Sequence, residues 1–420
     1  MPANSSPLDV KDPALLVSDE IIADRRIVVI KNYCHLSDVL YTLPCGIVCK
    51  DETGMGATHL ELTAPRPSII VEPLKITASS KAQKHGAVYY GSKTAQEPKP
   101  TAQEVRDRLL SLPPEKRKIV VVADSLRKVR EILGEEFKDY FLMIDEADSF
   151  QIDSTFRNSM SVCLDIYKEH PADMRALVTA TPLAFSDVGL KQESVIHIKY
   201  EIAQVRNIEL IHCDNINGTA IEVIRRILIQ TPADKIMIAY NSVGGCVDIA
   251  KHLVDKESQP QEDIKILCSS SSKDKAGIFF HELEGDVLPA KINLLTSAYF
   301  TGFDLHESYH LLSVSDGDNP IFLLSDSRLK QVSGRCRNGL LSETIVYSTS
   351  QATGEIPKVK DMVAAAQFEI RALECISFHY AKSPHLEPNI SKIRDQVINH
   401  TGDKGVCSQT KVDFLLDSVS

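Results

Sequence analysis

The sequence predicts an α/β protein with two successive units, each built on a parallel β-sheet, and a short helical C-terminal extension. Short runs rich in valine and isoleucine alternate with longer stretches in which apolar residues recur at helical spacing. The same alternation starts again beyond residue 207, and 420 residues give room for two or three domains. Because strands that alternate with helices pair in parallel, we expect each sheet to be covered on both faces.

The first unit, which we place at residues 20–203, contains the apolar runs expected to form buried strands. They are Ile27–Ile30, Cys45–Cys49, Ser68–Val71, Lys118–Val122, Tyr140–Ile144, Ala176–Thr179 and Val195–Ile198. Three stretches between these runs fit helices: Ala102–Leu112, Leu126–Leu133 and Ser159–Lys168.

The second unit, placed at residues 207–350, repeats the pattern. Its predicted strands are Ile208–Ile211, Lys235–Tyr240, Ile264–Leu267, Ile292–Thr296 and Tyr309–Val314, and its predicted helices are Gly218–Gln230 and Val247–Val254. The pattern then changes, and Lys358–His379 and Ile390–Asn399 are helix candidates in an extension at residues 355–420.

Composition excludes several classes of protein. The net charge of −10 argues against a generally basic nucleic-acid coat, although a local basic channel remains compatible with it. Apolar runs such as Ile119–Ala123 are far shorter than the roughly 18 residues that a membrane helix needs. The N-terminus lacks a secretory pattern, and the ten cysteines are dispersed, so we expect a cytoplasmic protein with reduced thiols.

A glycine-rich segment follows the predicted strand Cys45–Cys49 and precedes a possible helix. Strand, glycine turn and helix is the arrangement that aims backbone N–H groups at phosphate. Glycines at positions 54 and 56 let the chain approach an anion closely, and a threonine at position 58 stands where a P-loop hydroxyl binds Mg²⁺. The candidate phosphate-binding residues are Lys50, Thr53, Gly54, Met55, Gly56, Ala57 and Thr58.

The loop departs from a P-loop at one position. Ala57 stands where a P-loop carries the lysine that neutralises the β- and γ-phosphates. Two interpretations remain open. Either Lys50, at the mouth of the loop, supplies the missing charge, or the loop binds nucleotide poorly.

A second segment places carboxylates at the end of an apolar strand. Asp145, Glu146 and Asp148 directly follow Tyr140–Ile144, about 90 residues beyond the glycine-rich loop. An aspartate at a strand end can hold Mg²⁺, and the adjacent glutamate can polarise an attacking water. We therefore expect Asp145 as a metal ligand, Glu146 as a catalytic residue, and Asp148 as a link to neighbouring motifs.

Taken in order, five segments resemble the motifs of superfamily 2 helicases and translocases, over residues 25–350. They are Thr53–Thr58 (motif I), Asp145–Asp148 (motif II in its DEAD form), Thr179–Pro182 (motif III), Thr296–Asp304 (motif V) and Gln331–Arg337 (motif VI). The resemblance implies two RecA-like domains, with ATP and Mg²⁺ bound between them and nucleic acid as the partner.

The resemblance also implies roles for residues of the second unit. Gly302 and Asp304 would contact the nucleotide, Arg335 and Arg337 would stabilise the charge on the transferring phosphoryl group, and Gln331 would orient their segment. Motif VI is one residue tighter here than in most relatives, so which arginine acts stays open. The loop of this chain, without the lysine, also resembles the loops of helicase-like proteins from phages and mobile elements. A protein of that origin would lie in the host cytoplasm.

Contacts to a polymer are less visible in the sequence. Lys75, Lys81, Ser125 and Thr296 are the candidates for sequence-independent contact with a phosphate backbone. We expect DNA in preference to RNA, with replication or recombination proteins as possible partners. The competing interpretation of each lysine is a solvated surface charge. The competing function is a nucleotide-gated binding or scaffold protein with weak or no ATPase activity.

Overall fold

The computed structural model describes residues 7–22, 25–92, 100–152, 158–181, 188–203, 205–283, 285–300, 303–317, 319, 322–349, 371 and 375. They form two compact units that divide the chain between Ile202 and Ala203. Both units are α/β with mostly parallel sheets, which confirms the predicted fold class. Apart from residues 371 and 375, the predicted C-terminal helices lie outside the described residues, and so does Gly302 of motif V.

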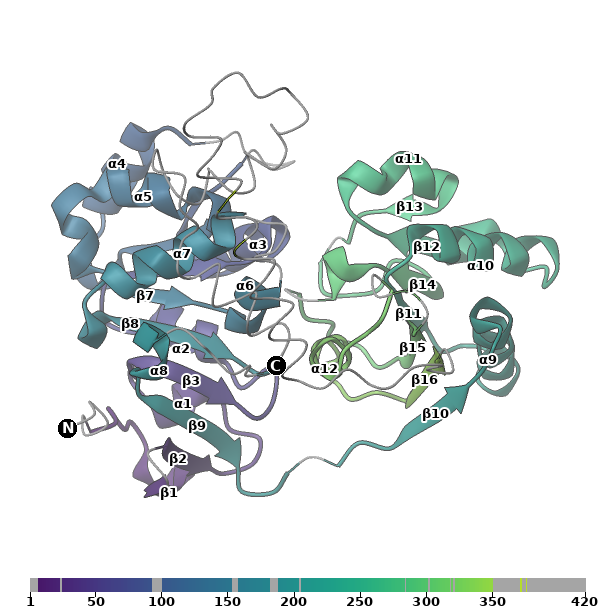
Figure 1. Ribbon diagram of the computed structural model, residues 1–420, viewed down its shortest axis with the longest axis horizontal. Helices are drawn as coiled ribbons and strands as arrows, with labels where there is room; N and C mark the ends of the chain where they lie inside the picture. Colours follow the sequence, from purple (N-terminus) through teal and green to yellow (C-terminus); the bar gives the residue numbers. More distant parts are fainter. Residues whose placement is uncertain are drawn as a thin grey trace. The chain divides into compact units, whose positions relative to one another are not determined.

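The first unit contains a nine-stranded sheet in the order β1-β2-β9-β3-β8-β7-β4-β6-β5 (Figure 1). Its strands are β1 (Leu16–Ile22), β2 (Arg25–Ile30), β3 (Gly46–Lys50), β4 (Ser68–Glu72), β5 (Val88–Tyr90), β6 (Lys118–Val122), β7 (Phe141–Ile144), β8 (Arg175–Thr179) and β9 (Val195–Tyr200). Only β1 and β2 pair antiparallel among these strands.

Helices cover both faces of this sheet (Figure 1). They are α1 (Leu36–Val39), α2 (Ala57–Thr63), α3 (Lys75–His85), α4 (Ala102–Leu110), α5 (Leu126–Leu133), α6 (Ala147–Ile152), α7 (Asn158–Glu169) and α8 (Val188–Lys191). Ile69 and Val71 of β4 join the apolar cluster beneath α4, α5 and α7, whereas Ile70 joins the opposite cluster with α2 and α3. Because both faces are buried, the strands read as continuous apolar runs.

The second unit contains a seven-stranded parallel sheet in the order β10-β16-β15-β11-β14-β12-β13. Its strands are β10 (Ile208–His212), β11 (Ile236–Tyr240), β12 (Ile264–Leu267), β13 (Phe280–His281), β14 (Ile292–Leu295), β15 (His310–Asp316) and β16 (Ser342–Ser348). Its helices are α9 (Ile216–Gln230), α10 (Val243–Asp255), α11 (Lys273–Ala276) and α12 (Asp326–Ser333).

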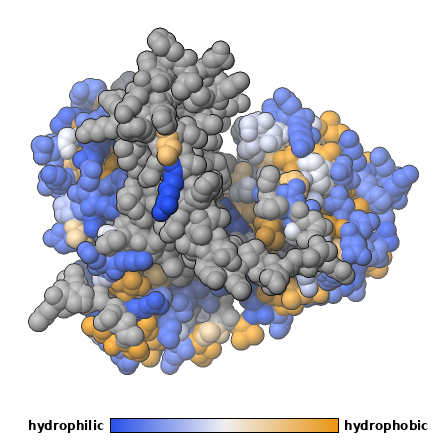
Figure 2. Space-filling model, viewed as in Figure 1, coloured by the Kyte–Doolittle hydropathy of each residue, from blue (hydrophilic) through white to orange (hydrophobic). Residues whose placement is uncertain are grey.

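The described surface mixes polar and apolar residues. On the face shown in Figure 2, hydrophobic residues gather over the end of the first unit where Figure 1 places β1 and β2. Ile21 and Ile22 of β1 are 61% and 56% exposed. Within the part of the chain that the structure describes, no helix is both long enough and apolar enough to cross a membrane.

Candidate nucleotide-binding site

The carboxyl ends of four neighbouring strands bring polar side chains to one edge of the first sheet. Strands β3, β8, β7 and β4 lie side by side, and all run in the same direction. Lys50, Thr179 and Glu72 are the last residues of β3, β8 and β4, and Asp145 directly follows β7. In an open α/β sheet, the carboxyl ends of the strands are where ligands bind.

The glycine-rich loop connects β3 to α2 at this edge. Gly54 and Gly56 have φ angles of 79° and 84°, a left-handed conformation that glycine adopts without steric cost. The carbonyl of Met55 accepts a hydrogen bond of 2.8 Å from the backbone N–H of Leu36, which ties the loop to α1. Met55 and Ala57 are buried, while Thr53 and Thr58 are half-buried. The loop therefore turns its apolar side chains inward.

Three elements meet at the hydroxyl of Thr58. Thr58 Oγ1, on α2, donates a hydrogen bond to Asp145 Oδ2. Lys81, on α3, places its Nζ atom 2.9 Å from Asp145 Oδ2, 2.8 Å from Glu72 Oε1 and 3.2 Å from Thr58 Oγ1. From the sequence we expected Lys81 at a polynucleotide backbone, whereas its ammonium group lies beside the loop.

Opposing effects set the charges of this cluster. Burial alone would raise the pKa of Asp145, but Lys81, Lys50 and the Thr58 hydroxyl hold that pKa well below its usual range. Burial alone would lower the pKa of Lys81, but Asp145 and Glu72 outweigh it and raise that pKa. Burial raises the pKa of Glu72 to about 8, against the opposing effect of the Lys81 charge. Asp145 is thus ionised and Lys81 is charged at neutral pH.

The acidic segment is linked to the predicted motif III. Asp148 Oδ1 accepts a hydrogen bond of 2.9 Å from the hydroxyl of Thr179, and this hydroxyl in turn accepts one of 3.0 Å from the backbone N–H of Thr181. Both threonines and Asp148 are buried. The backbone of Glu146 has a φ of 51°, and its N–H lies 3.0 Å from Asp145 Oδ1. Such strain in a non-glycine residue concentrates at functional sites.

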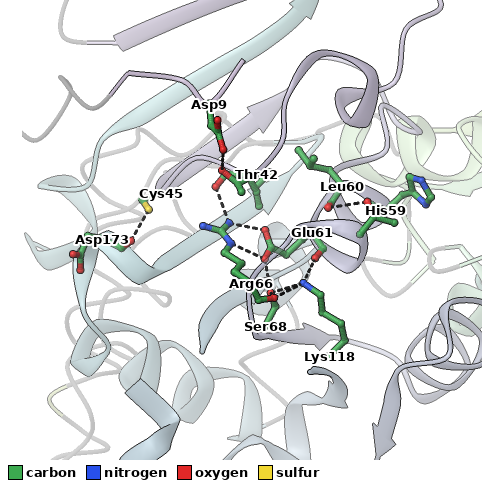
Figure 3. Close-up of polar contacts among 12 residues, drawn as sticks. Asp9, Thr42, Cys45, His59, Leu60, Glu61, Arg66, Ser68, Lys118 and Asp173 are labelled. Atoms are coloured by element: carbon green, nitrogen blue, oxygen red, sulfur yellow. Dashed lines mark hydrogen bonds and ion pairs between the residues drawn. The ribbon is translucent and has the colours of Figure 1, made fainter. Parts of the chain in front are cut away.

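A buried polar cluster behind the loop holds α2 against the sheet (Figure 3). Arg66 donates to both carboxylate oxygens of Glu61, at 2.9 and 2.6 Å, and its guanidinium lies over the ring of Phe141. Lys118 Nζ lies 2.7 Å from the carbonyl oxygens of Glu61 and Arg66, and 2.9 Å from Ser68 Oγ. Because Glu61 is on α2 and Lys118 is on β6, these bonds fix the helix that carries Thr58.

The oxygens at this edge fit Mg²⁺. One carboxylate and one hydroxyl lie in hydrogen-bond contact at Asp145 and Thr58. Protein Mg²⁺ sites commonly use one or two carboxylates and complete the shell with water and substrate phosphates. Among the described residues, no group of three or more His, Cys, Asp or Glu side chains could hold a metal ion by itself. A metal held here would therefore depend on a phosphate ligand.

In the second unit, the segments of motifs V and VI lie side by side. Leu305 N donates to the carbonyl of Arg335 at 2.8 Å, and Arg337 N donates to the carbonyl of Leu305 at 2.9 Å. Arg335 is 4% exposed and binds the carbonyls of Gln331 and Phe303, at 2.9 and 3.0 Å. Gln331 is fully buried.

The second arginine of motif VI has a different environment. The side chain of Arg337 is 22% exposed and forms an ion pair with Asp304, the last residue of motif V. Asp304 is itself 39% exposed. The two arginines therefore differ in accessibility, which the sequence pattern alone did not show.

The other candidates for polymer contact are separated by the fold. Lys75 is exposed at the first residue of α3, and Ser125 is half-buried at the end of a short 3₁₀ turn after β6. These two residues follow adjacent strands of the first sheet. Thr296 follows β14 in the second unit and is buried.

Solved structures of other proteins are similar to this chain. The DEAD-box helicase Mss116 bound to ssRNA and UDP-BeF is similar over 84% of this chain and 80% of its own, with 13% identity and a TM-score of 0.50. The two α/β units of the chain have the fold of this helicase core. S. cerevisiae Dbp5 bound to RNA and ADP BeF3 matches this core over 73% of this chain and 80% of its own (12% identity, TM-score 0.47).

The E. coli DExH-box NTPase HrpB also resembles the helicase core, over 78% of this chain and 43% of its own, with 16% identity and a TM-score of 0.45. No protein-family model and no curated protein matches the sequence. At such low identities the likeness concerns the fold of the helicase core.

Proposed function

We propose that the protein is an ATP-dependent nucleic-acid helicase or translocase of the superfamily 2 type. The contact of Thr58 with Asp145 carries this proposal, because it joins the glycine-rich loop to the acidic strand end within a helicase core. Phosphoryl transfer to water needs two parts in one place. One is a loop that can hold phosphates, and the other is a carboxylate that can hold Mg²⁺.

The roles within the first unit follow from this geometry. Gly54 and Gly56 allow the backbone of the loop to lie against the phosphates. Thr58 and Asp145 would hold Mg²⁺, which would neutralise charge on the phosphate oxygens. Glu146 polarises the attacking water, and Lys50, buried at the end of β3, adds positive charge at the mouth of the loop.

The second unit contributes the remaining groups. Arg335 and Arg337 are the candidates to stabilise charge on the γ-phosphate, and Gln331 supports their segment. Gly302 and Asp304 are candidates for contact with the nucleotide. Lys75, Ser125 and Thr296 would meet the phosphate backbone of the polymer, in a sequence-independent and salt-sensitive way. We keep DNA as the proposed polymer, with RNA as the alternative that the assay compares.

The test is ATP hydrolysis by the full chain with single-stranded DNA, with single-stranded RNA and with neither. We expect the protein to hydrolyse ATP, and to do so faster with the polymer that it prefers than with neither polymer. Glu146→Gln should stop hydrolysis while ATP stays bound, because the amide cannot accept the proton of the attacking water. Normal turnover in this variant would remove Glu146 from the mechanism.

A second function remains a candidate because of Ala57. Without a lysine in the loop, the protein would be a nucleotide-gated binding or scaffold protein that turns over ATP weakly or not at all. Polymer binding that depends on ATP, together with no hydrolysis on any polynucleotide, would favour this function.

A further inference from the structure

The glycine-rich loop lacks a cation of its own. Ala57 is 1% exposed and packs in the apolar cluster that also contains Met55 and Leu60. A nucleoside triphosphate that binds this loop needs positive charge against its β- and γ-phosphates. Within the first unit, that charge has to come from a side chain on another element.

We propose that Lys81, on α3, is the residue that supplies this charge. The inference rests on the proposed function, since it concerns how the same site binds nucleotide. The Nζ atom of Lys81 lies 3.2 Å from the hydroxyl of Thr58, the residue next to Ala57. Its side chain is 27% exposed, so Lys81 is held at the site without being sealed inside the protein.

Two carboxylates fix the position of the Lys81 ammonium group. It lies 2.8 Å from Glu72 and 2.9 Å from Asp145, at the ends of two adjacent strands. An ammonium group has three N–H donors, and here they face three oxygens. The contact with Thr58 is the longest of the three, so a phosphate oxygen above the loop can replace it while Glu72 keeps its hydrogen bond.

Glu72 acts as a positioning residue in this arrangement. Its side chain is fully buried, and its Oε1 accepts the hydrogen bond from Lys81. A carboxyl oxygen with no exposure holds a lysine in one place, because the loss of this hydrogen bond would leave the buried oxygen without a donor. The sequence places this glutamate one residue after a predicted strand, where it gives no sign of its role.

Lys50 is the rival source of charge. It is buried at the end of β3, and its positive charge lowers the pKa of Asp145. Lys81 differs from it because it contacts Thr58 directly. The two lysines can therefore be distinguished by which nucleotide phosphates each one stabilises.

The experiment measures the dissociation constants of ATP, ADP and AMP for the full chain in the presence of Mg²⁺, by calorimetry. We expect Lys81→Met to weaken ATP and ADP by about 10- to 100-fold, as the loss of one charge-assisted hydrogen bond implies, and to leave AMP unchanged. Lys50→Met should weaken ATP less than Lys81→Met does.

Lys116→Met is the matched control. Lys116 is an exposed lysine in a 3₁₀ turn that precedes β6, at the amino end of the sheet and away from the loop. This variant should bind all three nucleotides as the wild type does. The affinity of Lys81→Met for single-stranded polynucleotide should also stay unchanged, which separates nucleotide binding from contact with a polymer.

The outcomes separate this inference from the proposed function. If the wild type binds ATP and Lys81→Met binds it equally well, the role of Lys81 is refuted and the proposed function stands. Equal losses for ATP and AMP, or a loss in Lys50→Met alone, also refute it. A wild type that binds no nucleotide refutes both. Where Lys81→Met fails to fold, the same dissociation constants are measured for Lys81→Met/Glu72→Gln. This variant also removes the unpaired carboxyl group of Glu72.

Discussion

At the scale of single residues, Ala57 shows why the loop cannot simply be read as a damaged P-loop. Its methyl group is buried in the apolar cluster that α2 forms with the sheet. The position therefore holds a small apolar side chain for packing reasons. A lysine here would have to leave the cluster or force its neighbours apart.

Ala57→Lys should accordingly lower stability and fail to raise ATP affinity. Overpacking a filled cluster costs about 1–3 kcal/mol, and Lys81 already places a charge beside Thr58. Urea unfolding and ATP calorimetry measure the two effects. A variant that is as stable as the wild type and hydrolyses ATP faster would show that the site lacks a cation.

Glu146 illustrates a different property at this scale. Its φ of 51° is uncommon for a residue with a side chain, and the hydrogen bond of its N–H to Asp145 holds it there. The sequence could suggest a catalytic role for Glu146 from its neighbours, but it could not show the strain. Backbone strain depends on contacts that only the fold creates.

At the scale of elements, prediction from sequence succeeded for strands that are buried on both faces of the sheet. The strands β6 and β12 match the predicted ranges exactly, since a strand with both faces buried reads as a continuous apolar run. Helix α3 was not predicted, because it packs on the sheet through small residues such as Thr77, Ala78 and Ala82. Without this helix, Lys81 was predicted as a polymer contact, and its contact with the loop was missed.

His170 links α7 to the start of β7, and it makes folding sensitive to pH. Its Nε2 lies 2.8 Å from the carbonyl oxygen of Tyr140, and its ring packs edge-on against Phe137. Burial lowers the pKa of His170, and the charges of Arg175 and Arg130 lower it further, although the bond to Tyr140 opposes this. The folded state therefore favours neutral imidazole.

The free energy of unfolding should fall as the pH drops below about 6.5, because the unfolded chain then binds a proton that the folded state resists. The contribution is about 1.4 kcal/mol for each pH unit by which folding lowers the pKa of His170. Urea titrations between pH 5 and pH 8 measure it. His170→Gln should reduce the slope, and a slope equal to that of the wild type would contradict the assignment.

At the scale of the whole molecule, the proposed activity divides between the two units. The first unit contains the loop and the acidic strand end, and the second contains the arginines of motif VI. The order of the motifs along the chain was enough to predict this division. It could not distinguish Arg335 from Arg337, because their spacing is unusual and only the side-chain surroundings separate them.

Those surroundings assign different roles to the two arginines. Arg335 is buried and bound to two backbone carbonyls, so it joins motif VI to motif V. The side chain of Arg337 is partly exposed and pairs with the carboxylate of Asp304. A group that stabilises a transition state has to be free to reach the substrate. We therefore propose that Arg337, and not Arg335, has the catalytic role.

Arg337→Ala should bind ATP with unchanged affinity and lose at least about 100-fold in kcat, since an arginine finger contributes mainly in the transition state. Its unfolding free energy should change by less than about 1 kcal/mol, as expected for an exposed ion pair. Arg335→Ala should instead destabilise the protein by about 1–3 kcal/mol, because two buried carbonyls lose their donor. Single-turnover kinetics and urea unfolding of both variants measure these effects. The reverse pattern, with turnover lost in a stable Arg335→Ala and stability lost in Arg337→Ala, would exchange the two roles.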